Sequence, residues 1–193
     1  MNIMDCFTLV KKEIDAITRH APSEIEYQHS QSILAIVLRL NPNADDALKI
    51  AALGHDIDRS IPEKRIRPEE FIDYKEYKRQ HSIRSAEIIS EIMKSCGCKE
   101  DLIERTRVLI ENHEVGGSGD VEILKDADSI SFFQDNLSHY HRTYPDVFKD
   151  KIRFMYIRLS PKGRALAREA ISVDTFLKGE VNKVIEEIES LDE

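Results

Sequence analysis

Apolar residues recur every three or four positions along nearly the whole 193-residue chain. This spacing is the period of an amphipathic α-helix, and no segment alternates apolar and polar residues as a half-buried β-strand would. The fold class that the pattern predicts is all-α, a helical bundle with additional helices towards the C-terminus. The predicted helices cover about residues 4–20, 24–40, 43–54, 68–95 with a candidate break near Arg79, 99–113, 121–140, 145–160 and 162–190.

Length and charge limit the classes of protein to which the chain can belong. Without an internal repeat or a linker-like tract, 193 residues suit a single domain, residues 1–193. A net charge of −8 argues against general binding to nucleic acid or to anionic membrane surfaces. The longest apolar run, residues 33–38, is far shorter than the roughly 20 residues that span a bilayer. We therefore expect no membrane partner.

The N-terminal segment and the cysteines bear on the location of the protein. The first residues lack the basic lead and small-residue cleavage site of a signal peptide. Three cysteines, an odd number without a CxxC spacing, do not suggest a disulfide framework or a strong metal site. We expect a cytoplasmic protein in which Cys6, Cys96 and Cys98 are reduced thiols.

Four ionisable residues fall on helix faces that should point into the core. His29, His81 and His113 lie within the apolar stripes of three predicted helices, and Asp128 lies within the stripe of a later one. A single buried histidine is usually a core residue with a hydrogen-bond partner. Four buried ionisable groups on separate helices each lose their hydration and need a partner that compensates for the loss. A shared metal site supplies that partner for all of them.

The dipeptide His55-Asp56 strengthens this interpretation. Neighbouring residues diverge by 100° on a regular helix, so both can reach one ion only where a helix ends. Gly54 before the pair and Pro62 after it place the dipeptide at such an end. An imidazole beside a carboxylate suits transition metals, and a carboxylate can bridge two ions.

In chain order, this pattern resembles the signature H…HD…D of the HD superfamily of helical metal-dependent phosphohydrolases. The two further histidines resemble the binuclear subgroup, H…HD…H…H…D, and the spacing is most similar to the bacterial diadenosine tetraphosphatase branch. The resemblance covers about residues 20–135 as a metal-binding core and leaves about 136–193 as a C-terminal helical extension. The matching residues are His29, His55, Asp56, His81, His113 and Asp128.

The resemblance implies two ligand sets that share one carboxylate, and a hydroxide between the two ions as the nucleophile towards a phosphoryl group. The ions would be two divalent or mixed-valent transition metals, Fe or Mn first, with Co and Zn as alternatives. One ion takes His29, His55, Asp56 and Asp128, and the other takes Asp56, His81 and His113.

The residues after the dipeptide depart from the commonest pattern of the superfamily, HD-x-G-K or HD-x-G-H. Arg59 stands at the basic position, where a guanidinium can bind a phosphate oxygen, and it joins His55 and Asp56 as a predicted catalytic residue. Asp58 replaces the glycine; it either orients Arg59 or a histidine ligand, or is a solvated acid at a helix end.

Further cations surround His81. We include Lys78 and Arg84 with Arg59 as candidate substrate-binding residues. The alternative for the group is a solvated charged face of a helix.

These observations predict a metal-dependent phosphohydrolase, a monomer or homodimer, that acts on a nucleotide or another small phosphorylated metabolite. Two alternatives remain. The same six ligands occur in diiron oxygenases of the superfamily, such as myo-inositol oxygenase, and a metal-loaded ligand-binding module would perform no chemistry. Replacing His55 or Asp56 with alanine should abolish turnover in either enzyme but leave ligand binding partly intact in the module.

Overall fold

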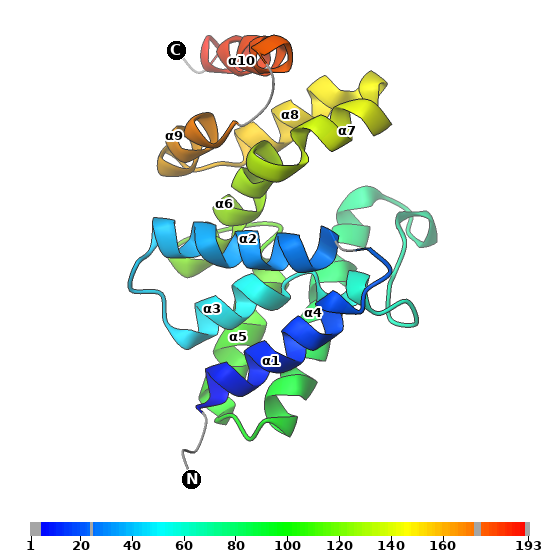
Figure 1. The fold of residues 1–193 in the computed structure, drawn as a ribbon, viewed down its shortest axis with the longest axis vertical. Coiled ribbons are helices and arrows are strands. Elements are labelled where there is room, and N and C mark those ends of the chain that lie inside the picture. The colour runs from blue at the N-terminus through cyan, green and yellow to red at the C-terminus, as the bar shows by residue number, and fades with distance from the viewer. Residues whose placement is uncertain (1–4, 24, 172–174, 192–193) are drawn as a thin grey trace. The chain divides into compact units, whose positions relative to one another are not determined.

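The computed structural model describes residues 5–23, 25–171 and 175–191, and this part of the chain forms helices without a strand (Figure 1). The predicted all-α fold class is therefore confirmed. No helix in the described ranges has the length and apolar character that crossing a bilayer requires. The α-helices are α1 (Cys6–Arg19), α2 (Ile25–Leu40), α3 (Asp46–Gly54), α4 (Tyr74–Ser95), α5 (Glu100–Asn112), α6 (Asp120–Ser131), α7 (Leu137–Thr143), α8 (Phe148–Ile157), α9 (Pro161–Ala170) and α10 (Thr175–Glu189).

Four short helical segments connect these helices. The 3-10 turns are η1 (Ile57–Ser60), η2 (Pro68–Glu70) and η4 (Pro145–Val147), and η3 (Phe132–Asn136) is a π-helix between α6 and α7. The chain divides into two compact units, Met1–Leu124 and Lys125–Glu193. The sequence places the boundary between core and extension near residue 135 and treats both as one domain.

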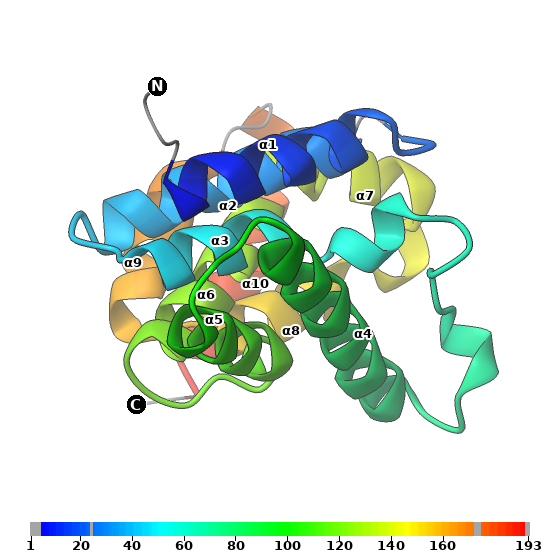
Figure 2. The same ribbon diagram turned by 90° about the horizontal axis from the view of Figure 1, so that it is seen from below.

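The first unit packs α1, α2 and α3 together, with α4 and α5 against α3 (Figures 1 and 2). Its core is the set of apolar faces that the helical period predicts, with Val10, Ile14 and Ile33 fully buried. Helix α3 begins at an N-cap, Asp45, whose side chain accepts a hydrogen bond of 2.9 Å from the amide of Leu48.

Glycine at the end of α3 permits a close approach to α4. A Cβ at Gly54 would lie 2.7 Å from Cγ1 of Ile89, so any larger residue would push the two helices apart. Because His55 and Asp56 follow Gly54 directly, this contact sets them beside α4, which carries His81.

Helix α4 differs from its prediction at its start and near its middle. It begins at Tyr74, because Asp73 caps it by accepting a hydrogen bond of 2.7 Å from the amide of Glu76, and the predicted start at Pro68 forms η2 instead. The helix then continues to Ser95, so the candidate break near Arg79 is wrong.

The expectation of three reduced thiols is also wrong. Cys6 at the start of α1 forms a disulfide with Cys98, in the loop between α4 and α5, and Cys96 is the free cysteine of the described residues. Packing of α1 against α4 brings together two residues separated by 92 positions, which spacing along the chain cannot reveal.

In the second unit α8 packs against α10, and α9 packs against η3. The predicted continuous helix over about 162–190 is wrong near Ile171, where ψ is 102° and α9 has ended. Residues 172–174 of that prediction lie outside the described residues, as do Met4 and Glu24 of the first two predicted helices.

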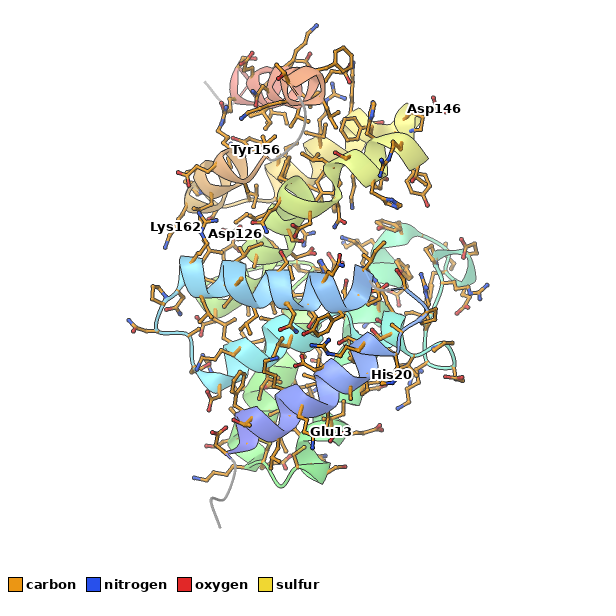
Figure 3. The ribbon with its side chains drawn as sticks, in the orientation of Figure 1. Glu13, His20, Asp126, Asp146, Tyr156 and Lys162 are labelled. Carbon is orange, nitrogen blue, oxygen red and sulfur yellow. A yellow bond between two sulfur atoms is a disulfide. The ribbon has the colours of Figure 1, made fainter. Side chains whose placement is uncertain are left out.

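Asp126 of α6 anchors the start of α9, where Lys162 is labelled in Figure 3. Its carboxylate accepts a hydrogen bond of 2.9 Å from the amide of Ser160 and another from the hydroxyl of the same residue. The buried carboxylate of Asp126 thereby binds both donors of Ser160, the N-cap residue of α9.

Candidate metal centre

Helix ends and helix faces of the first unit bring five of the six predicted ligands together. His29 lies on α2 and His81 on α4, at the positions where their apolar stripes turn inward. His55 is the C-cap of α3, Asp56 is the residue before η1, and His113 is the C-cap of α5. The C-terminal ends of α3 and α5 therefore both place an imidazole beside Asp56.

Asp56 is the centre of this cluster. Its Oδ1 lies 2.6 Å from Nε2 of His81, and its Oδ2 lies 3.7 Å from Nε2 of His29. The remaining two imidazoles approach Oδ1 through their Nε2 atoms, His55 at 3.7 Å and His113 at 3.8 Å. One buried carboxylate is thus surrounded by four imidazole nitrogens.

The imidazoles are also close to one another. Nε2 of His29 and Nε2 of His55 are 3.3 Å apart, and the ring centroids of His55 and His113 are 5.0 Å apart. Nδ1 of His113 lies 2.7 Å from the carbonyl of Ile110, so a proton on Nδ1 can bond to that carbonyl while Nε2 faces the cluster.

Within the first unit, two overlapping groups of donor atoms could hold a metal ion. In each group the ligand atoms lie within 4.8 Å of one another. Imidazole and carboxylate donors in this combination suit Fe, Mn, Co and Zn, so the donor chemistry fits a transition metal. The first group is His55, Asp56 and His113, and the second is His81, His113 and Glu114.

Sequence reasoning missed Glu114. It follows His113 at the end of α5 just as Asp56 follows His55 at the end of α3, and this repeated His-acid dipeptide is the signal that could have found it. Its carboxylate lies 3.8 Å from Nε2 of His113 and is largely buried.

Two neighbouring cationic groups, Arg59 and His81, stabilise the negative charge of Asp56. Burial opposes ionisation of Asp56, yet the Arg59 guanidinium and the nearby imidazoles hold the pKa of this carboxyl well below its usual range. Burial also disfavours the charged form of His81, but the carboxylates of Asp56 and Asp58 raise the pKa of His81 to about 9. Without a metal, an imidazolium and a guanidinium therefore face Asp56.

The guanidinium of Arg59 contacts the cluster directly. Its Nη1 lies 2.5 Å from Oδ2 of Asp56, and its Nη2 lies 3.5 Å from Nε2 of His81. The structure thus places the predicted phosphate-binding arginine at the cluster, where it pairs with a predicted metal ligand.

The other two candidate substrate-binding cations have different surroundings. Lys78 is 13% exposed and pairs with Glu114 at 2.5 Å, so it does not belong to a solvated face. Arg84 is exposed and pairs with Glu87 at 3.2 Å on the same helix.

Asp58 is buried beside His81 rather than solvated. Its Oδ1 lies 2.8 Å from Nδ1 of His81. Of the alternatives that the sequence left open for Asp58, a solvated acid is therefore wrong, and contact with a predicted histidine ligand is found.

The sixth predicted ligand, Asp128, belongs to the second unit. It lies on α6, where Nη1 of Arg158 is 3.3 Å from its Oδ2. Its part in a metal site stays a prediction of the sequence.

A small pocket opens beside His29, His55 and Asp56. Its volume is about 10 Å³, close to the space that one water molecule or ion needs. Glu26, which lies one turn before His29, also lines the pocket, and burial together with the charge of Asp56 raises the pKa of its carboxyl. Sequence reasoning missed this residue as well, although its spacing of three from His29 puts both on one helix face.

One comparison with known proteins gives a match. A family model described as a domain of unknown function (DUF4202) matches residues 10–181, a range that contains the whole cluster. No curated protein and no solved structure matches the chain.

Proposed function

The chain belongs to the DUF4202 family, whose description assigns no activity, and we propose that it is a metal-dependent phosphohydrolase acting on a nucleotide or another small phosphorylated metabolite. The observation that carries the proposal is the buried carboxylate of Asp56 with four imidazole nitrogens within 3.8 Å. Burying so many ionisable groups is costly unless they share a compensating partner, and a metal ion is the partner that these donors suit.

The residues of the first unit would divide between two ions. His29, His55 and Asp56, which lie side by side, would hold one ion. Asp56 would also reach the second ion beside His81 and His113. Ions in such sites lower the pKa of a coordinated water and neutralise charge on a phosphoryl oxygen. The proposed ions are Fe or Mn, with Co and Zn as alternatives.

Arg59 would bind the substrate. Its guanidinium can donate two parallel hydrogen bonds to a phosphoryl oxygen pair. It now pairs with Asp56, and it becomes available to a phosphate once a metal ion carries the charge of that carboxylate. Lys78, held beside the cluster by Glu114, adds a second positive charge near the same place.

Location and assembly belong to the proposal as well. The sequence predicts a cytoplasmic monomer or homodimer. The bond between Cys6 and Cys98 weighs against the cytoplasm, because disulfides are rare in reducing compartments. Alkylation of thiols in intact cells is expected to label Cys6 and Cys98 if the location is cytoplasmic, and light scattering gives the assembly state.

A screen of the purified protein tests the reaction. The protein is stripped of metal, reloaded with Fe, Mn, Co or Zn, and assayed against nucleotides and phosphate monoesters with and without O₂. We expect metal-dependent release of phosphate or a nucleotide without O₂, and its loss in Asp56→Ala. The matched control is His20→Ala, at the exposed C-terminal end of α1 (Figure 3).

The other outcomes favour the alternative functions. Turnover that requires O₂ and iron would replace the hydrolase with an oxygenase. Ligand binding without turnover, retained in part by Asp56→Ala, would leave a binding module.

A further inference from the structure

The imidazole of His81 lies between two carboxylates, one at each ring nitrogen. Nε2 is 2.6 Å from Oδ1 of Asp56, and Nδ1 is 2.8 Å from Oδ1 of Asp58. His81 is 0% exposed and Asp58 is 1% exposed, so solvent does not compete for either nitrogen. Asp58 therefore contacts the side of the ring that faces away from the central carboxylate.

Separate contacts fix Asp58 in this position. The hydroxyl of Ser85, one turn after His81 on α4, donates a hydrogen bond of 3.1 Å to Oδ1 of Asp58. The backbone amide of Asp58 in turn donates a hydrogen bond of 3.4 Å to the hydroxyl oxygen of Ser85. Ser85 is itself buried, so the carboxylate and the imidazole are both anchored to α4.

A second contact restrains the ring of His81. The ring of Tyr77, one turn earlier on α4, stacks on it with centroids 6.0 Å apart and planes inclined by 22°. The imidazole is thus held by its face and by the hydrogen bond between Nε2 and Asp56. At Nδ1 the Asp58 carboxylate lies within ion-pair distance, although the two groups are not aligned as a hydrogen bond.

A histidine binds a metal only through a nitrogen without a proton, so the partner of the other nitrogen decides which one is available. An acceptor at Nδ1 keeps the proton there and leaves Nε2 for the metal. We propose that Asp58 is a positioning residue that holds the proton of His81 on Nδ1 and so directs Nε2 to a metal ion shared with Asp56. This inference rests on metal binding at the cluster, which the proposed function requires, but not on the reaction.

Zinc alone is the probe, because it is diamagnetic and needs no substrate. In the zinc-loaded full chain, long-range ¹H–¹⁵N NMR of the histidine rings should show His81 with a proton on Nδ1 and zinc on Nε2. Coordination through Nδ1, or a proton on Nε2, would overturn the proposal.

Two substitutions separate positioning from a merely structural role. Asp58→Ala removes the acceptor, and zinc affinity is expected to fall about 10- to 100-fold, the usual effect of losing such a partner. Asp58→Asn keeps an oxygen acceptor at Nδ1 and should restore most of the affinity and the Nδ1 proton. The matched control is Asp150→Ala, an exposed acid on α8 that should not change zinc binding.

The possible results separate the proposed role of Asp58 from the proposed hydrolase activity. Wild-type affinity in Asp58→Ala would refute the role of Asp58 and leave the metal centre intact. If Asp58→Ala does not fold, Asp58→Asn provides the test. The role of Asp58 would be refuted if His81 in that variant lost its Nδ1 proton while the zinc affinity stayed unchanged. A wild-type chain that binds no zinc would overturn both proposals, whereas an inactive chain that binds zinc through Nε2 would overturn only the hydrolase.

Discussion

Raising the pH should destabilise the metal-free protein through His81. The ordinary pKa of this imidazole is 6.5, and the folded protein raises it to about 9. A group with a raised folded-state pKa stabilises the fold fully below its unfolded pKa and loses that contribution as the pH passes its folded pKa. Each pKa unit corresponds to about 1.4 kcal/mol, so about 3 kcal/mol of unfolding free energy should disappear between pH 6.5 and about pH 9.

Urea unfolding of the chelator-treated protein, repeated at pH steps from about 6 to about 10, measures this loss. The control is His81→Gln, which keeps a polar side chain but cannot titrate. Because the two proteins share every other side chain, the difference between the two pH profiles isolates His81. Profiles that run parallel across the window would refute the assignment of a stabilising imidazolium between Asp56 and Asp58.

Three stability predictions concern contacts inside one unit or the other. In Gly163→Ala the new Cβ would lie 2.6 Å from Oδ2 of Asp126, so chemical denaturation should show a loss of about 1–3 kcal/mol, and a variant as stable as the wild type would contradict the close approach. Cys6→Ser should lose about 2–4 kcal/mol through the missing bond to Cys98, and a reductant should then lower the melting temperature of the wild type but not of the variant. Ile110→Ala on α5 removes a fully buried side chain and should cost about 2–5 kcal/mol in urea unfolding, whereas a loss below about 1 kcal/mol would contradict its burial.

The helices could be predicted because burial of one face imposes the 3.6-residue period. The capping residue Asp45 falls at the predicted start of α3, whereas the predicted start of α4 at residue 68 overlooked its cap, Asp73. The end of α9 could not be predicted. Ile171 is apolar and continues the period, but its backbone leaves the helical region. The disulfide between Cys6 and Cys98 could not be predicted either, because it depends on the packing of α1 against α4 and not on the spacing of cysteines along the chain.

The candidate site was predictable where a residue type carries the chemistry. Histidines on inward faces and the His55-Asp56 dipeptide identified the cluster from the chain alone. The surroundings of Asp58 and Lys78 were not predictable, because each depends on how η1, α4 and the end of α5 approach one another. Glu114 was overlooked although its dipeptide repeats the pattern of the first.

Metal content with ion positions tests the central claim most directly. Anaerobically purified protein would be examined by elemental analysis and by anomalous diffraction at the metal edge. The account predicts two ions within about 4 Å of each other, as in two-metal sites, with Asp56 between them and the histidines of the first unit as ligands. Protein that holds no metal at Asp56 and these histidines, even after reconstitution with Fe, Mn, Co and Zn, would contradict it.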